Sequence, residues 1–568
     1  MRRDTRLPLG LLAAGLAMWA GAVPGIDLAA MDDTGLVSAL PLLAVAGLVA
    51  LNVGFCLALR RSPVPSRLLA AYAVALVVML YGITSVVGEA PRGSVVWRHA
   101  GIIDNLVRTG QPDPTIDAYF NWPGLFMFGA SVSELAGFAS PMAFARWAPV
   151  YFNLLYLAPL AMILRSATDD ARLVWLGVWL FCLTNWINQD YFAPQSATYF
   201  LFLVVVAVVL RWFGPEPAPA GARQRGVLMG VVLIVVAASV PTHQLTPFAM
   251  LAAVTALVAI RRCRATGLPV VIAVLIASWL GFMTLAYLRG HLPELVGRIG
   301  DVGGTASANV GDRLQGSPGH LLVVRTRLLL TGGVGALALL GALRHLDRRQ
   351  RLWPMAALAV APLPLLLLQP YGGEMIMRVY LFSLPFLVFF AAAVFYSGPR
   401  SVISWRGTAA MASVCTLLLG GFLVSRYGNE RMDQYTAAEL AAVDRLYQLA
   451  PAGSLLVAGA GNLPWKYRDY ERYDYLTLTS LWEKDPRLED VVHRAAGAMA
   501  AGSSYLIFTR SQQAYTDLLG VMPTGTLRRI EDAVAASPQF ALVHRSADAS
   551  IFATAPALPM VVAAGAGS

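Results

Sequence analysis

Long apolar runs recur along most of this chain, and they limit its possible folds more than any other feature of the sequence. A bilayer crossing takes roughly 17–25 such residues. Thirteen runs approach or reach that length, near 7–24, 36–59, 68–88, 147–164, 173–188, 196–212, 227–241, 247–260, 269–288, 321–343, 352–369, 379–396 and 408–425. Only 13% of the residues are charged, and the mean hydropathy is +0.60. Because lipid admits only helices and closed barrels, the sequence predicts an all-α polytopic membrane protein of about 13 transmembrane helices.

One further apolar run, 122–138, differs from the others. It begins with Pro123 and Gly124 and carries Glu134. Proline and glycine break the start of a helix, and a carboxylate inside the membrane is costly. We therefore expect this run to be re-entrant or interfacial and not to cross.

Arginines in the loops predict the orientation. If 122–138 does not cross, one side receives the N-terminal arginines and the clusters at 60–67, 165–172, 211–225, 261–264, 344–351 and 400–406. The opposite short loops, around 25–35, 188–196 and 241–247, contain no arginine or lysine. Cytoplasmic loops carry the excess of basic residues, so the N-terminus is predicted to be cytoplasmic. The first run resembles a cleavable signal peptide, but a retained span is favoured because further spans follow at once.

Composition divides the chain into two predicted domains. Residues 1–425 form the transmembrane domain, with long outer loops at 89–121 and 289–320. Residues 426–568 hold the two lysines of the chain, many tyrosines and several short strand-like runs, with helical patterns between them. This region is predicted to be a small extracytoplasmic α/β domain. Basic residues form no continuous face that would suit nucleic acid, and the four cysteines show neither metal-ligand spacing nor a disulfide framework.

The first outer loop contains three acidic candidates, Glu89, Asp104 and Asp117. Residues 97–108 place Ile102, Ile103, Leu106 and Val107 on one helical face, and Gly110 ends the pattern, which predicts an amphipathic helix on the outer membrane surface. A carboxylate at the membrane mouth can act as a general base toward a hydroxyl group. The alternative is that these acids are only solvated. Arg98 and His99 on the same helix are candidate ligands for an anion.

Two shorter outer segments combine aromatic rings with amides. The loop 185–196 contains Asp190, Tyr191 and Gln195, and the turn 241–247 contains His243 and Gln244 between two prolines. Planar hydrogen-bonding groups beside a ring suit a sugar. An ordinary aromatic belt and a structural histidine are the alternatives.

The segment 369–380 contains Glu374 and Arg378, spaced i and i+4 on a helix. Arginine is the side chain best suited to hold a phosphate in a site of low dielectric. A pair that merely neutralises itself at the mouth of a span is the alternative.

Taken together, these features resemble the GT-C superfamily, integral-membrane glycosyltransferases that use polyprenyl-phosphate-linked sugars. The segments around Asn121-Trp122-Pro123-Gly124, Asp190–Gln195 and His243–Pro247 look like those of large actinobacterial membrane proteins usually assigned to it. The resemblance implies a plasma-membrane enzyme that moves a sugar from a polyprenyl-phosphate donor to a cell-envelope glycan or lipid acceptor on the outer face. It also implies one carboxylate as base, cationic groups for the phosphate, and room for a divalent cation.

The chain departs from that pattern in one respect. Two extra spans precede the first long outer loop, and no Asp-Glu or Asp-Asp pair opens it. Glu89 has the nearest equivalent position, and the base stays open among Glu89, Asp104 and Asp117.

Three other functions remain possible from the sequence. An O-antigen-type polymerase or ligase would use arginine and histidine in a large outer loop, and loop 289–320 has Arg289, His291, Arg298, Asp301, Asp312, Arg313 and His320. A transporter would place ionisable residues in mid-span, where this chain has almost none. A non-catalytic scaffold presenting the C-terminal domain would tolerate the loss of every candidate acid.

Overall fold

Each of the thirteen predicted runs contains a helix in the computed structural model. The structure describes residues 6–138, 140–297, 300–345, 349–367, 371, 373–396, 403–482, 487–500 and 502–554. The helices of these runs are α1 (Arg6–Ala22), α3 (Leu42–Leu59), α4 (Ser66–Tyr81), α9 (Ala148–Ala167), α10 (Ala171–Thr184), α11 (Pro194–Trp212), α12 (Ala222–Ser239), α13 (Thr246–Ala259), α14 (Leu268–Phe282), α17 (Pro318–Arg344), α18 (Arg349–Val360), α19 (Met375–Ala393) and α20 (Trp405–Tyr427). Short helices α2 (Leu36–Ala39), α5 (Ile83–Val87), α8 (Met142–Ala145) and α21 (Glu430–Asp433) connect them.

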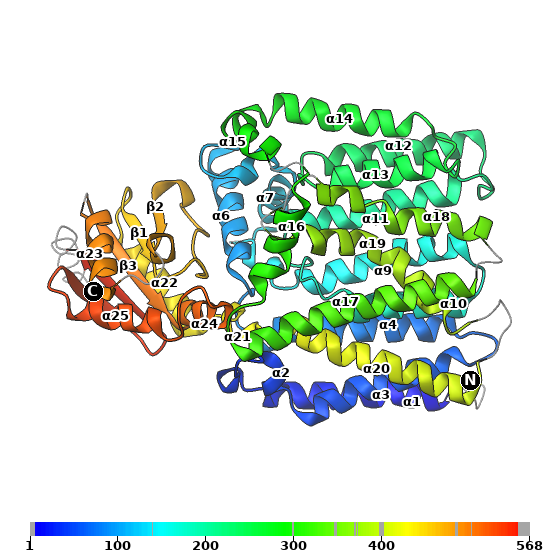
Figure 1. The fold of residues 1–568 in the computed structure, drawn as a ribbon, viewed down its shortest axis with the longest axis horizontal. Coiled ribbons are helices and arrows are strands. Elements are labelled where there is room, and N and C mark those ends of the chain that lie inside the picture. Colours follow the sequence, from blue (N-terminus) through cyan, green and yellow to red (C-terminus); the bar gives the residue numbers. More distant parts are fainter. Residues whose placement is uncertain are drawn as a thin grey trace.

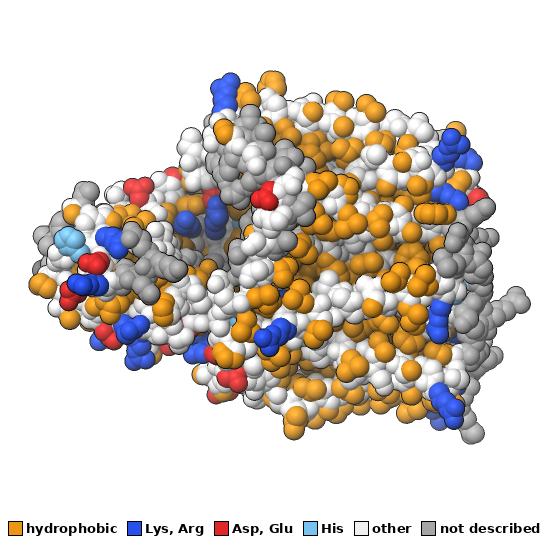
Figure 2. Space-filling view, viewed as in Figure 1, with side chains coloured by type: hydrophobic (Ala, Val, Ile, Leu, Met, Phe, Trp, Pro, Cys, Tyr) orange, Lys and Arg blue, Asp and Glu red, His pale blue; other side chains and the backbone are white. Residues whose placement is uncertain are grey.

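These helices lie side by side in one bundle (Figure 1). Eight of the described helices are long and apolar enough to cross a membrane, and five of the predicted runs correspond to shorter apolar helices. Hydrophobic side chains cover the flank of the bundle, and basic side chains are exposed at the end near the N-terminus (Figure 2). The chain is therefore a polytopic helical membrane protein, as predicted.

Helix α19 forms the centre of the bundle. Of the 18-residue apolar stretch of α19, 83% is buried inside the protein, whereas the corresponding share for α12 is 17%. Helices α10, α17 and α18 pack against it. Because α19 is held on several sides, its first turn, at the end of the bundle near the C-terminal domain, is a rigid base for side chains.

The first helix packs tightly on the third. A Cβ atom at Gly15 would stand 2.9 Å from the carbonyl oxygen of Gly47, and one at Gly47 would stand 2.8 Å from that of Gly15. Small residues let helix backbones approach closely in membranes. This packing places α1 within the bundle.

The C-terminal domain is a five-stranded mixed sheet with helices, as the sequence predicts. Its strands are β1 (Leu455–Ala458), β2 (Asp474–Thr477), β3 (Ser504–Thr509), β4 (Phe540–Arg545) and β5 (Ala549–Thr554), in the order β2-β1-β3-β5-β4. β1 runs parallel to β2 and β3, whereas β5 runs antiparallel to β3 and β4. The accompanying helices are α22 (Ala437–Leu449), α23 (Leu488–Ala498), α24 (Arg510–Leu519) and α25 (Thr526–Ala536).

Four more helices gather where the bundle faces this domain (Figure 1). They are α6 (Ser94–Thr109), α7 (Gly124–Ala136), α15 (Leu285–Gly297) and α16 (Val302–Asn309). Helix α7 is the run 122–138, and its 13 residues span about 20 Å, less than the roughly 30 Å of a hydrocarbon core. It lies at the end of the bundle opposite the N-terminus.

Helix α6 is the predicted amphipathic helix, but its surroundings differ from the prediction. It packs on α7 and contacts the segment Tyr470–Arg472 of the C-terminal domain. Ile102, Ile103 and Leu106 are buried in these contacts, whereas Val107 is 41% exposed. The apolar face is thus used for packing within the protein.

Candidate functional site

Five segments that are far apart in the sequence meet around one cavity. Its volume is about 450 Å³. The lining residues are Val95, Tyr119, Gln189, Tyr191, Ala193, Pro194, Gln195, His243, Gln244, Tyr287, Tyr371, Glu374 and Arg378. Six of the predicted site residues are therefore brought together: Tyr191, Gln195, His243, Gln244, Glu374 and Arg378.

Arg378 is the buried cation of this cavity. It lies in the first turn of α19, and only 6% of its surface is exposed. Its Nη2 donates to Glu374 Oε2 at 2.6 Å, and its guanidinium carbon is 5.6 Å from the ring centre of Tyr371. Its Nε and Nη1 have no hydrogen-bond partner among the described residues. A buried donor without a partner costs about 1–3 kcal/mol or more when charged, so these two nitrogens are available to an anion.

His243 is a neutral donor beside this arginine. Its Nδ1 accepts hydrogen bonds from the backbone N–H groups of Leu245 at 3.3 Å and Thr246 at 3.1 Å. The proton of the neutral ring is therefore on Nε2, which lies 3.4 Å from Tyr371 Oη. Burial and the nearby Arg378 hold the pKa of His243 well below its ordinary value. The imidazole thus offers an N–H group without a charge.

Tyr371 is held in a conformation that non-glycine residues rarely adopt. Its φ angle is 53°, and such backbone strain costs of order 1–3 kcal/mol. Gln244 Nε2 donates to its hydroxyl oxygen at 2.7 Å. The strained backbone and this hydrogen bond place the phenol in the cavity wall.

Two glutamines supply acceptors on the same wall. Gln195 Nε2 donates to Thr246 Oγ1 at 3.4 Å, which leaves its carbonyl oxygen facing no donor in the described part of the chain. The side-chain oxygen of Gln189 likewise has no donor there. Free acceptors beside free donors are what a polyhydroxylated ligand requires.

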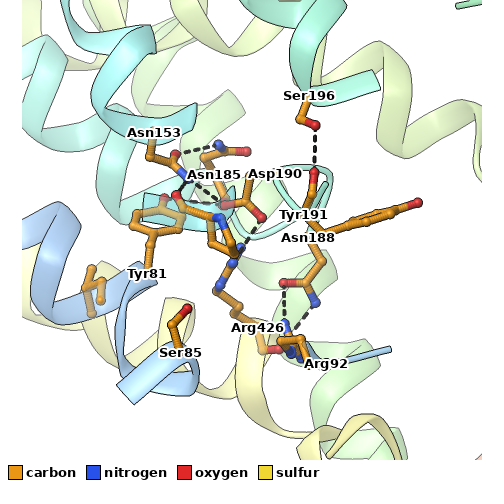
Figure 3. Close-up of polar contacts among 12 residues, drawn as sticks. Tyr81, Ser85, Arg92, Asn153, Asn185, Asn188, Asp190, Tyr191, Ser196 and Arg426 are labelled. Carbon is orange, nitrogen blue, oxygen red and sulfur yellow. Dashed lines mark hydrogen bonds and ion pairs between the residues drawn. The ribbon is translucent and has the colours of Figure 1, made fainter. Parts of the chain in front are cut away.

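Asp190 does not line the cavity, and it supports the loop behind it. Its Oδ1 accepts from Arg426 Nη2 at 3.0 Å and its Oδ2 from Asn153 Nδ2 at 2.5 Å, with all three side chains buried. Figure 3 shows Asp190 directed at Arg426, whereas the ring of Tyr191 points away from this cluster. The buried pair thus fixes the loop that carries Tyr191.

The three acids predicted as candidate bases lie outside the cavity lining. Glu89 is exposed. Asp104 accepts from Arg108 Nε at 3.0 Å and from the backbone N–H of Asp469 at 3.1 Å. Among the described residues, Glu374 is the carboxylate that lines the cavity.

Asp117 joins α6 to the C-terminal domain. It accepts from Arg98 Nε at 2.5 Å, from Tyr470 Oη at 2.8 Å and from the backbone N–H of Tyr119 at 2.9 Å. Its side chain is almost wholly buried. The carboxylate is thus fully committed to protein groups, which suits a structural role.

His99 lies behind the aromatic wall. Its Nδ1 donates to the carbonyl oxygen of Phe192 at 2.8 Å, and its ring is stacked on Tyr191 at 5.9 Å and perpendicular to Tyr119 at 5.0 Å. Burial lowers the pKa of His99 to about 4, so the ring is neutral. It positions two rings that line the cavity.

The second half of loop 289–320 holds the segment that carries Glu374. Arg313 Nη2 donates to the carbonyl oxygen of Gly373 at 2.9 Å, and Asn309 Oδ1 accepts from the backbone N–H of Ile376 at 3.0 Å. His320 is buried against Asn429. Arg298 and the side chains of His291 and Asp312 lie outside the described residues.

Seven lining residues were not among the predicted site residues, and four of them are aromatic or carry an amide: Tyr119, Gln189, Tyr287 and Tyr371. The first two adjoin the predicted Asp117 and Asp190, and Tyr371 precedes Glu374 by three positions. The signal in the sequence that could have indicated these residues was an aromatic or amide side chain close to a predicted polar residue. For a divalent cation, the described residues contain no group of three or more His, Cys, Asp or Glu able to hold a metal.

No protein-family model matches the chain, and no curated protein matches it. Among solved structures, the chain is similar to ArnT from Cupriavidus metallidurans bound to undecaprenyl phosphate, with a TM-score of 0.48, 12% identity, and coverage of 85% of this chain and 97% of that one. It is also similar to the oligosaccharyltransferase AglB from Archaeoglobus fulgidus in complex with an inhibitory peptide and a dolichol-phosphate. There the TM-score is 0.49, the identity 14%, and the coverage 82% and 72%. These are likenesses of fold at low identity, so the activity of this chain has to be inferred from its own residues.

Proposed function

We propose that this chain is a membrane glycosyltransferase that moves a sugar from a polyprenyl-phosphate donor to a cell-envelope glycan or lipid acceptor on the outer face of the plasma membrane. The observation that carries the proposal is Arg378, a buried guanidinium at the mouth of a span with two free nitrogens. Arginine binds phosphate through paired N–H groups. A lipid phosphate lies at the membrane surface, where the first turn of a spanning helix such as α19 is expected to lie.

An apolar groove next to the cavity suits the lipid part of such a donor. Its volume is about 290 Å³, and it runs between α12 and α14, where Val240, Pro241, Trp279 and Phe282 are among the lining residues. Pro241 is two residues from His243 of the cavity wall. A phosphate at Arg378 and an isoprenoid chain along this groove would use both surfaces together.

The cavity wall also supplies the groups that sugar transfer requires. Glu374 takes the proton of the acceptor hydroxyl as its oxygen bonds to the anomeric carbon. The bond from that carbon to the phosphate oxygen breaks, and the electron pair leaves with the lipid phosphate, which needs no protonation. Arg378 and the N–H of His243 stabilise the departing phosphate.

Gln189 and Gln195 accept hydrogen bonds from sugar hydroxyls, and the rings of Tyr191 and Tyr371 supply flat apolar surface. One carboxylate, one phosphate clamp and free acceptors on one wall are a complete minimal set for this reaction. The proposal thus moves the base from the loop acids to Glu374.

Purified protein in nanodiscs tests the reaction directly. The assay incubates it with a panel of polyprenyl-phosphate sugars and measures release of the lipid phosphate. We expect release with at least one sugar, and Glu374→Gln should lower turnover roughly 10²–10⁴-fold because it keeps the shape of the side chain and removes its basicity. Asp104→Asn is the matched control. Absence of release with every donor, or normal turnover of Glu374→Gln, would contradict the proposed chemistry.

A labelling experiment tests the proposed orientation. The four native cysteines are buried, so cysteines introduced at the exposed positions Gln539 and Thr266 can be followed alone. An impermeant thiol reagent on intact cells should modify Gln539→Cys and spare Thr266→Cys. The reverse pattern would place the cavity on the cytoplasmic side and exclude outer-face transfer.

A further inference from the structure

A second cationic site lies where α6 meets the C-terminal domain. Its centre is Lys466, one of the two lysines in the chain. The ammonium group lies over three aromatic rings, at 5.5 Å from the ring centre of Trp465, 5.4 Å from Tyr470 and 4.7 Å from Tyr475. Arg98 of α6 is the other cation at this junction, and 37% of its side chain is exposed.

The backbone of Lys466 is strained and firmly held. Its φ angle is 64°, a value that L side chains rarely adopt. Its N–H donates to Tyr447 Oη at 2.7 Å, and its carbonyl oxygen would stand 1.7 Å from a Cβ atom at Gly101 of α6. Strain of this kind persists only where the surrounding structure enforces it, and it is concentrated at functional sites. The position of this lysine is therefore fixed from both domains.

The positive charge of this pair is not balanced within the described structure. Asp117 is the acid that faces both cations, and it already accepts hydrogen bonds from Arg98 and Tyr470. No carboxylate forms an ion pair with Lys466 in the described ranges. Burial and the charge of Arg98 lower the pKa of Lys466 to about 8, against the opposing effect of Asp117. An added anion would compensate the second positive charge.

This junction is close to the proposed reaction site. Arg98 lies over the ring of Tyr119 at 5.0 Å, and Tyr119 lines the cavity. Basic side chains are exposed in the hollow between the C-terminal domain and the bundle (Figure 2).

We infer that Lys466 and Arg98 bind an anionic group, a phosphate or carboxylate, carried by the acceptor. The inference rests on the proposed function and adds a substrate class to it: the acceptor is acidic. The single phosphate of a polyprenyl-phosphate donor is already assigned to Arg378 in the cavity. A second anion site at the junction of α6 with the C-terminal domain therefore belongs to the other substrate.

The chain offers a direct chemical readout. Full-length protein in phosphatidylcholine nanodiscs is acetylated with acetic anhydride, and modification of Lys466 is followed by mass spectrometry with Lys484 as the internal reference. Inorganic pyrophosphate is the probe. Only the neutral amine reacts with the anhydride. At a pH below the pKa of Lys466, an anion that raises this pKa by one unit therefore slows acetylation of Lys466 about tenfold. We expect that protection at Lys466 and none at Lys484.

Two variants and a change of lipid complete the test. Arg98→Gln should abolish the protection, whereas Arg108→Gln, on the same helix and paired with Glu471 at 2.8 Å, should retain it. Absence of protection by pyrophosphate in the wild-type protein would overturn the inference. Protection by nanodiscs containing phosphatidylglycerol but not by pyrophosphate would assign the site to lipid headgroups and also overturn it.

A kinetic measurement links the site to the acceptor. In the transfer assay, Lys466→Gln should raise the KM of the acceptor and leave the KM of the donor unchanged. An effect on the donor alone would contradict the assignment. Because the acetylation readout needs no sugar transfer, failure of this inference and failure of the proposed function can be told apart.

Discussion

The cavity wall and the polar cluster behind it are built from similar residues, yet their hydrogen bonding differs. In the cluster, both carboxylate oxygens of Asp190 accept hydrogen bonds, from Arg426 and Asn153, and the three side chains are buried, while Arg426 Nη1 has no partner among the described residues. On the cavity wall, Arg378 keeps two free nitrogens and Gln195 a free carbonyl oxygen. Native proteins pair nearly all buried polar groups. The complete set of hydrogen bonds around Asp190 is therefore structural, and the incomplete set on the wall lines a cavity, where a ligand can supply the missing partners.

Breaking the complete set should have the largest effect on stability. Removing one partner of a buried ion pair leaves an uncompensated charge and costs about 3–5 kcal/mol. We expect Arg426→Met to lower the unfolding free energy by that amount, measured by denaturation in detergent. The double variant Asp190→Leu, Arg426→Met should recover much of the loss. A single variant as stable as the wild type would show that the cluster does not hold the loop.

Changing the incomplete set should affect binding and leave the fold intact. Arg378→Gln removes a charged partner of the donor phosphate, and hydrogen bonds to charged groups contribute about 1.5–3 kcal/mol, or roughly 10–100-fold in affinity. The measurement is donor binding to protein in nanodiscs, with the unfolding midpoint as the control. A large loss of stability with unchanged donor affinity would place Arg378 with the structural set.

His99 packs against two rings of the cavity wall, Tyr119 and Tyr191, and gives the stability of the protein a pH dependence. Its pKa is lowered to about 4 in the folded protein, against about 6.5 in the unfolded chain, so the unfolded state binds the extra proton. Stability is full above about pH 6.5 and falls as the pH drops toward 4. We expect His99→Gln to flatten this part of the stability–pH curve. An unchanged curve would mean that another group titrates there.

The sequence predicted the architecture better than the detail of the site. Apolar runs and the change in composition near residue 426 depend on local residues, and the helices and the sheet follow them. The cavity depends on how segments far apart in the sequence meet. Sequence periodicity could therefore indicate individual residues of the cavity but not that they come together. Asp190 was predicted to bind substrate and Asp117 to be a candidate base because both are polar and lie outside the predicted spans. Their partners, Arg426 and Tyr470, are distant in the sequence and could not be foreseen.

The smallest effects on turnover are expected from substitution of the loop acids Glu89 and Asp104. These substitutions test whether Glu374 is the general base. Glu89 is exposed and lies outside the cavity lining. Asp104 is paired with Arg108, both about one-third exposed, and such pairs contribute about 0–1 kcal/mol. A carboxylate outside the cavity cannot reach a hydroxyl placed against Arg378, whereas Glu374 can. Glu89→Gln and Asp104→Asn should therefore keep turnover within about threefold of the wild type, far from the 10²–10⁴-fold loss of a missing base. A loss of that size at Glu89 with normal turnover of Glu374→Gln would return the base to the first outer loop, and Arg378 would then have to act on a phosphate presented from that side.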